Sequence, residues 1–221
     1  MDQRFLRAIQ GGNAKISFSQ LGEDGVLLWL FEGKTGGFYV DVGCHHPYRY
    51  SNTAALHLYH GWSGINIDVE QRAIDEFKTE RPHDLSICTA VGNRTGSVEA
   101  SFFQDSALTT LDSAAASNPY FAHVPRSSRT VQVRKLGDIL GEVLSPDRQI
   151  DFLNVDVEGL DLEVLSSHDW ESFRPEVVAV EAHGIDLNDP QRNATWCFLR
   201  DKRYDIVSHV GVTSIFKSAS A

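Results

Sequence analysis

Carboxylate side chains lie at or near the ends of four short apolar runs of this sequence. They are Asp41, Asp68, Asp156 and Glu181, in the runs 38–42, 65–68, 150–156 and 176–182. If these runs are parallel strands of one sheet, the side chains meet at its carboxyl edge, where such sheets bind ligands. Burying an unpaired carboxylate is costly. Four at one edge therefore indicate a ligand, a metal ion or dedicated hydrogen bonds.

The spacing of Gly43 and Asp68 is typical of a site for an adenosine cofactor. A glycine directly after a strand lets the backbone approach a ligand closely. Asp68, 25 positions later, is placed to bind both ribose hydroxyls. A dinucleotide does not fit, because the loop after Gly43 lacks the second and third glycines of GxGxxG, and Pro47 delays the helix that would hold a pyrophosphate. The pattern favours a cofactor without phosphates.

A second group of residues could carry the chemistry of a reaction. Asp156 and Glu158 are two positions apart, as are Glu181 and His183, and this spacing puts each pair on one face of a strand. In one mechanism, Asp156, Glu181 and His183 bind a divalent cation such as Mg²⁺. In the other, Asp156 contacts the cofactor and His183 acts alone as the general base, because the ordinary pKa of histidine suits that role. With or without a metal, the hypothesis is that His183 removes the proton, helped by Asp156 and Glu158. Local hydrogen bonding alone is a third interpretation of Glu158 and His183.

Strands and helices that alternate along the chain would position these residues. The patterns predict strands at 38–42, 65–68, 85–91, 150–156 and 176–182, helices at 20–31, 51–60, 72–81, 136–144, 160–167 and 191–202, extra strands at 98–103 and 130–133, and a hairpin at 204–209 and 213–217. Such alternation indicates a doubly wound α/β fold. We expect a Rossmann-like sheet of the class I methyltransferase type, mostly parallel and twisted, with one antiparallel C-terminal strand and helices on both faces.

The whole chain, residues 1–221, is predicted to be a single domain. Residues 1–18 are polar and form a lead-in segment. Residues 104–129 are long for a connection in a compact domain, which indicates a lid or substrate loop. Its ring-bearing side chains could stack on a sugar, and its arginines suit either an anionic group of an acceptor or a solvated surface. These residues are Tyr120, Phe121, His123, Arg126 and Arg129.

Composition narrows the class of protein. The chain has a net charge of −10 and no long cluster of Lys and Arg, which argues against nucleic acid as a partner. No apolar run approaches the roughly 20 residues of a membrane helix, and the N-terminus lacks the pattern of a signal peptide. Three widely spaced cysteines fit free thiols. We therefore expect a cytoplasmic protein without a membrane span that does not bind nucleic acid.

Five motifs in consistent order resemble the FkbM family of methyltransferases. They are SQLGED at 19–24 (family SQxGED), YVDVGCHHP at 39–47 (VDVGAHHP), SNT at 51–53 (SNT), GWSGINID at 61–68 (GWxGINID) and IDFLNVDVEG at 150–159 (IDFLKIDVEG). Several motifs in register are far more specific than a lone glycine loop. The sequence departs from the family at Cys44, where alanine is usual, and at Val69-Glu70, where many members have Pro-Asn.

The resemblance implies a class I fold that binds S-adenosylmethionine. Asp41 and Gly43 would border the methionine part of this cofactor, and Asp68 would hold its ribose. Ala90 and Val91 would line the adenine.

The resemblance also implies a reaction, O-methylation of a hydroxyl on a carbohydrate or glycosylated small molecule. Some related sugar methyltransferases use magnesium. Gln20 and Asn52 could close the site from above, or Gln20 could be exposed and Asn52 could cap its helix. The alternatives are a non-catalytic cofactor-binding module and a metal-dependent hydrolase on the same fold. An oligomer is compatible with the sequence.

Overall fold

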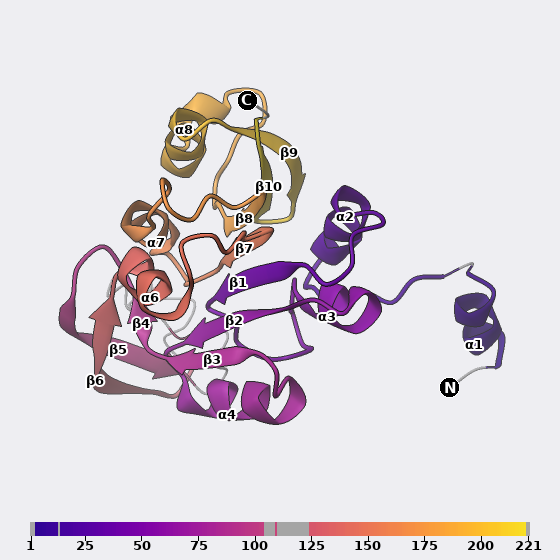
Figure 1. Ribbon diagram of the computed structural model, residues 1–221, viewed down its shortest axis with the longest axis horizontal. Helices are drawn as coiled ribbons and strands as arrows, with labels where there is room; N and C mark the ends of the chain where they lie inside the picture. Colours follow the sequence, from indigo (N-terminus) through magenta and orange to yellow (C-terminus); the bar gives the residue numbers. More distant parts are fainter. Residues whose placement is uncertain (1–2, 13, 104–108, 110–123, 220–221) are drawn as a thin grey trace.

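A seven-stranded sheet forms the centre of the computed structural model, which describes residues 3–12, 14–103, 109 and 124–219 (Figure 1). Its strands are β1 (Phe38–Val42), β2 (Ser63–Asp68), β3 (Leu85–Cys88), β7 (Phe152–Val155), β8 (Val177–Glu181), β9 (Tyr204–Val210) and β10 (Thr213–Ser218). Their order is β3-β2-β1-β7-β8-β10-β9. Neighbouring strands from β3 to β8 are parallel, whereas β10 is antiparallel to both of its neighbours. The predicted sheet is confirmed, and its order reverses between β1 and β7.

Helices cover both faces of this sheet because its side chains alternate in direction. The described helices are α1 (Gln3–Gln10), α2 (Glu23–Leu30), α3 (Ala54–His60), α4 (Gln71–Glu80), α6 (Leu136–Val143), α7 (Asp161–Ser167), α8 (Ala194–Asp201) and the 3₁₀ helix η3 (Pro190–Arg192). Tyr39 and its sheet neighbours pack against α2 and α3. Val40 and Val42 face the other way and pack with α6, α7 and α8. Within the described part of the chain, no helix is long and apolar enough to cross a membrane.

The predicted strand at 85–91 is wrong as a single element. The chain pairs with β2 only as far as Cys88. It then enters a second sheet of order β4-β6-β5, formed by β4 (Ala90–Val91), β5 (Gly96–Phe103) and β6 (Arg126–Arg134). Thr89 marks the change, because its backbone N–H donates to the Asp68 carbonyl (2.9 Å) and its hydroxyl donates to the Gln132 carbonyl (3.2 Å).

The predicted loop at 104–129 lies mostly outside the described residues, including Tyr120, Phe121 and His123. Arg126 and Arg129 belong to β6 and not to a loop.

Two predicted helices are shorter in the structure for local reasons. The helix expected at 20–31 begins at Glu23, because Gly22 has a left-handed φ of 98° that a helix cannot contain. The helix expected at 191–202 is divided, because the Asn193 side chain caps α8 by accepting the Trp196 N–H (2.9 Å). The lead-in contains α1, which Figure 1 shows apart from the sheet.

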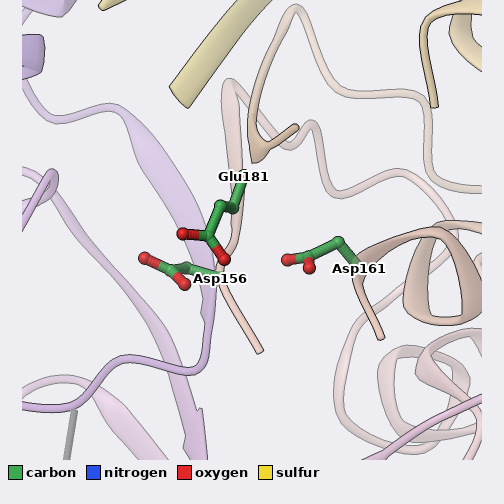
Figure 2. Close-up of side chains that lie close together, drawn as sticks. All are labelled: Asp156, Asp161 and Glu181. Carbon is green, nitrogen blue, oxygen red and sulfur yellow. The ribbon is translucent and has the colours of Figure 1, made fainter. Parts of the chain in front are cut away.

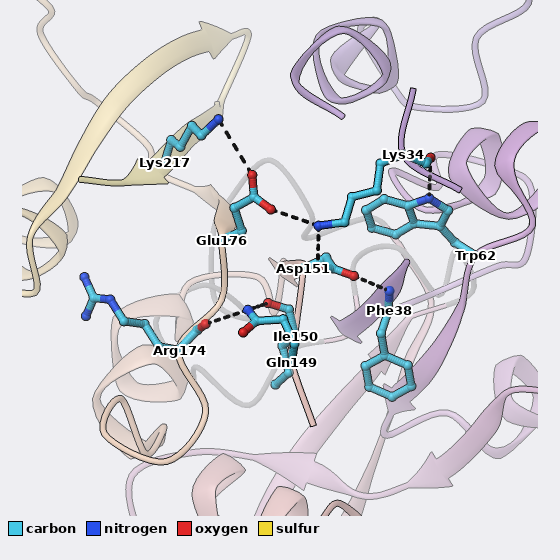
Figure 3. Close-up of polar contacts among 9 residues, drawn as sticks. All are labelled: Lys34, Phe38, Trp62, Gln149, Ile150, Asp151, Arg174, Glu176 and Lys217. Atoms are coloured by element: carbon cyan, nitrogen blue, oxygen red, sulfur yellow. Dashed lines mark hydrogen bonds and ion pairs between the residues drawn. The ribbon is translucent and has the colours of Figure 1, made fainter. Parts of the chain in front are cut away.

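Charged side chains join the amino ends of three parallel strands (Figure 3). Lys34 donates to Asp151 (2.7 Å) and to Glu176 (3.0 Å), which precede β7 and β8. Asp151 also accepts the backbone N–H of Phe38 at the start of β1 (2.7 Å). Burial lowers the pKa of Lys34, but its hydrogen bonds to the two carboxylates outweigh that effect and raise the pKa. This network fixes the edge of the sheet opposite the carboxyl ends.

Candidate active site

A cavity of about 430 Å³ opens at the carboxyl ends of β1, β2, β7 and β8, a size typical of cofactor sites. Every residue predicted for the cofactor lines it, namely Gln20, Asp41, Gly43, Asn52, Asp68, Ala90 and Val91. The residues predicted for catalysis or a metal line it as well, namely Asp156, Glu158, Glu181 and His183. The fold thus brings all eleven residues to one place, and their contacts determine what each could do there.

Gly43 is required by packing as well as by any ligand. Its φ is 78°, and a Cβ at this position would overlap the backbone carbonyl of Asp156. Its N–H donates to the Ile67 carbonyl (2.9 Å), which ties the turn after β1 to β2. A side chain at position 43 would therefore push apart the ends of β1 and β7, which form the floor of the cavity.

Asp68 is held so that its carboxylate faces the cavity. One oxygen accepts the backbone N–H of His45 (2.9 Å), and the other accepts that of Glu70 (2.7 Å). Burial raises the pKa of Asp68 to about 6, despite these two hydrogen bonds, which lower it. Because a carboxylate oxygen can accept two hydrogen bonds, both oxygens keep capacity for the hydroxyls of a ribose.

Asp41 is buried in a network that the sequence did not reveal. Its carboxylate accepts hydrogen bonds from the Thr53 hydroxyl and the Asn154 amide, both at 2.9 Å. Burial is the main cause of its raised pKa. Asn154 also accepts from the Asn52 amide (3.0 Å). The residue before α3 is Thr53, so the interpretation of Asn52 as a helix cap is wrong. Gln20 lies at the edge of the cavity and is exposed.

Arg81 is completely buried beneath this network. Its guanidinium donates to the Tyr39 and Thr53 hydroxyls, each at 2.9 Å, and to the Pro47 carbonyl. It therefore fixes the loop between β1 and α3 that forms one wall of the cavity. No pattern in the sequence indicates this role, because an arginine at the end of an amphipathic helix is usually solvated.

Three acidic side chains gather beside the other wall, and two of them, Asp156 and Glu181, line the cavity. Oxygens of Asp156, Asp161 and Glu181 lie within 4.8 Å of one another (Figure 2). Asp161, at the start of α7, was not a predicted site residue. It accepts the backbone N–H groups of Val157 (3.1 Å) and Gly159 (3.3 Å) and so also shapes the turn after β7. In the described residues, His183 is not part of this oxygen cluster.

His183 instead pairs with Glu181. Its Nε2 lies 3.0 Å from Glu181 Oε1, and the side chain of His183 is 64% exposed whereas that of Glu181 is 9% exposed. The prediction that strand alternation orients Glu158 and His183 is wrong. Strand β7 ends at Val155 and β8 at Glu181, so both residues lie beyond the strands. Glu158 lies in the turn beyond β7 with a left-handed φ of 54°. The turns, and not strand alternation, aim Glu158 and His183 at the cavity.

The model of the methyltransferase FkbM domain family matches residues 41–206, about three quarters of the sequence. The chain belongs to the FkbM methyltransferase family. Among solved structures, a TehB-like SAM-dependent methyltransferase from Corynebacterium glutamicum is similar at 12% identity and a TM-score of 0.39, over 98% of this chain and 95% of that one. No curated protein sequence matches the chain. S-adenosylmethionine is the expected cofactor of the family.

Acidic groups dominate the electrostatics of this FkbM-family site. Burial, reinforced by the neighbouring carboxylates, raises the pKa of Asp156 well above its ordinary value and that of Glu158 to about 7. Burial and Asp161 raise the pKa of Glu181 to about 7, and burial raises that of Asp161 to about 6. Near neutral pH the cluster therefore retains protons unless a positive charge compensates it. A sulfonium cofactor or a metal cation would supply such a charge.

Proposed function

We propose that this protein transfers the methyl group of S-adenosylmethionine to a hydroxyl oxygen of a carbohydrate or glycosylated small molecule. The observation that carries the proposal is one cavity with two functional halves. Asp68 offers carboxylate oxygens to a ribose in one half, and the His183–Glu181 pair lies in the other. Family membership supports the methyl donor, and the exposed imidazole supports an acceptor that must lose a proton.

The cofactor half has the groups that the methyl donor needs. Asp68 is positioned to accept hydrogen bonds from the ribose, and the buried Ala90 and Val91 offer an apolar surface to the adenine. Gly43 leaves room beside the methionine part. When bound, S-adenosylmethionine supplies an electrophilic methyl group, so the protein has mainly to align the acceptor and remove its proton.

His183 is the proposed general base, and Glu181 orients it. In this proposal the N–H of the neutral imidazole is on Nε2 of His183, which lies 3.0 Å from Glu181 Oε1. The lone pair of Nδ1 is then available for the proton of the acceptor hydroxyl. Glu181 also stabilises the imidazolium that results, as a buried carboxylate does for other catalytic histidines.

A divalent cation at Asp156, Asp161 and Glu181 is the second part of the proposal. Carboxylate oxygens are the ligands that Mg²⁺ prefers. Glu181 Oε2 is buried and has no hydrogen-bond partner among the described residues, which leaves it available while Oε1 contacts His183. When bound, the cation would orient an acceptor hydroxyl and lower its pKa.

Calorimetric titration with S-adenosylmethionine and S-adenosylhomocysteine tests the cofactor, with and without EDTA. We expect binding by the natural protein, a loss of about tenfold or more in Asp68→Ala, and no loss in the control Asp75→Ala, an exposed acid on α4. Binding of Mg²⁺ without either adenosine ligand would instead favour a metal-dependent hydrolase. Cofactor binding without methyl transfer to any glycoside would favour a non-catalytic module.

Methyl transfer from radiolabelled cofactor to a panel of methyl glycosides tests the base. We expect His183→Ala to lower kcat about 10²–10⁴-fold, and the exposed control His83→Ala to leave it unchanged. Full activity of His183→Ala would refute the assignment. An EDTA-sensitive rate that Asp161→Asn abolishes would support the cation, and a rate insensitive to EDTA would exclude it from the mechanism.

A further inference from the structure

The loop between β1 and α3 holds two residues in an uncommon backbone conformation at the cavity. His45 and Tyr50 both line the cavity, with left-handed φ values of 55° and 60°. Residues with a Cβ avoid this region, because the Cβ then lies too close to the following carbonyl oxygen. Such strain persists only where the surroundings enforce it, and it gathers at functional sites.

The surroundings of this loop do enforce it. His45 is fixed by the hydrogen bond from its N–H to Asp68, and Pro47 by the buried guanidinium of Arg81. The backbone N–H groups of Tyr48 and Arg49 both donate to His46 Nδ1, at 2.9 and 3.0 Å. These contacts therefore hold the loop in place, and the loop in turn positions the side chains that it carries.

Three of those side chains form one assembly, which we name the rim cluster: His45, Arg49 and Tyr50. The rings of His45 and Tyr50 are stacked, with an interplanar angle of 16° and centroids 6.3 Å apart. The guanidinium of Arg49 lies 5.2 Å from the centroid of the Tyr50 ring, and its Nη2 is 2.9 Å from His45 Nε2. Arg49 is exposed, and Tyr50 is 50% exposed.

The contact with Arg49 engages the ring of His45. A guanidinium has only donors, so Nη2 of Arg49 donates and Nε2 of His45 accepts. His45 is thus occupied in orienting Arg49. This leaves His183 as the histidine of the cavity that is suited to remove a proton.

We propose that the rim cluster is the acceptor subsite and that it selects a sugar bearing an acidic group, a carboxylate or a phosphate. The inference rests on the proposed function. The described lining of the inner cavity includes the acidic side chains of Asp68, Asp156 and Glu181 and no lysine or arginine, so it offers an anion no ammonium or guanidinium partner. An acidic group must therefore remain outside, beside Arg49, whose planar guanidinium suits carboxylate and phosphate. The exposed ring of Tyr50 offers a surface for the apolar face of the sugar.

The test is calorimetric titration of protein saturated with S-adenosylhomocysteine, using methyl β-D-glucoside and methyl β-D-glucuronide, which differ only at C6, a hydroxymethyl group in the first and a carboxylate in the second. We expect the glucuronide to bind about tenfold or more tightly. Arg49→Gln should abolish this preference. The control Arg72→Gln removes an equal charge from α4, where the side chain is 90% exposed, and should keep it. Glucose 6-phosphate in a third titration shows whether the acidic group is a phosphate.

Two results would overturn the proposal. One is the absence of a preference that depends on Arg49. This would be seen as equal affinity for all three sugars, as no detectable binding of any of them, or as a preference for the acidic sugar that persists in Arg49→Gln. The other is weaker binding of S-adenosylhomocysteine to Arg49→Gln, which would place Arg49 on the carboxylate of the cofactor. Cofactor binding by the natural protein is measured in the same series. Its absence would refute the proposed function, whereas cofactor binding without a preference for acidic sugars would refute only the subsite.

Discussion

Replacing Glu181 with glutamine should stabilise the unliganded protein at alkaline pH. In the folded state the pKa of Glu181 is raised from an ordinary 4.5 to about 7, and its side chain is only 9% exposed. The folded state therefore binds the proton more tightly than the unfolded state does. For a raised pKa, ionisation destabilises the fold, and the cost grows as pH rises from about 4.5 to about 7.

The two pKa values set the size of the effect. Linkage gives a cost of under about 1 kcal/mol at about pH 5 and about 3 kcal/mol at about pH 8. Glu181→Gln removes this cost, keeps the size of the side chain, and relieves the repulsion that raises the pKa of Asp156 and Glu158. In a domain of this length, ~3 kcal/mol corresponds to a rise in Tm of roughly 6–12 °C.

Thermal and urea unfolding of both proteins, at pH values from about 5 to about 8 and in EDTA, measures the difference. The variant should gain stability over the natural protein as pH rises, with little difference at the acidic end. Glu171→Gln, an exposed acid, is the matched control and should give parallel curves. A variant that is equally stable or less stable at about pH 8 would refute the idea that the cluster is strained by its own charge.

Three further changes test other parts of the structure. Gly43→Ala should destabilise the fold by about 3 kcal/mol or more, because its Cβ overlaps the Asp156 carbonyl at a left-handed φ; a Tm within error of the natural protein would contradict the packing. Lys34→Met should cost about 1–3 kcal/mol in urea unfolding, because it leaves the 9%-exposed carboxylate of Asp151 without its cation. If a cation binds the cluster, Mg²⁺ should raise the Tm of the natural protein but not that of Asp161→Asn, and an equal rise in both would place the ion elsewhere.

The sequence predicted the strand-end residues well because their position follows from short-range patterns. Asp68 and Glu181 end their strands, and Asp156 follows its strand directly, so strand prediction alone brought them to one edge. Asn154 and Arg81 were missed for the opposite reason. Their roles depend on which side chains surround them in the folded chain, and neither asparagine nor arginine is a residue type that indicates burial.

Prediction also failed where turns, and not strands, set direction. Strand alternation does not orient Glu158, because a left-handed φ turns the chain after β7. Asp161 reaches the acidic cluster only because it begins α7 and closes the same turn. Both facts depend on how a turn packs against the start of a helix, which residue spacing does not encode.

The charge distribution connects the proposed donor, base and acceptor subsite. Carboxylates along the inner cavity favour a positively charged ligand there, as a sulfonium is, and they disfavour an anion. Glu181, whose Oε1 lies 3.0 Å from Nε2 of His183, is placed to balance the positive charge with which the proposed base would finish the step. The carboxylates of the inner cavity would oppose any acceptor whose acidic group entered the cavity together with its hydroxyl. Arg49 stands outside the acidic wall, on a loop held in a strained conformation. An acceptor with its hydroxyl inside the cavity and its acidic group outside would keep that group away from the carboxylates and beside the guanidinium of Arg49.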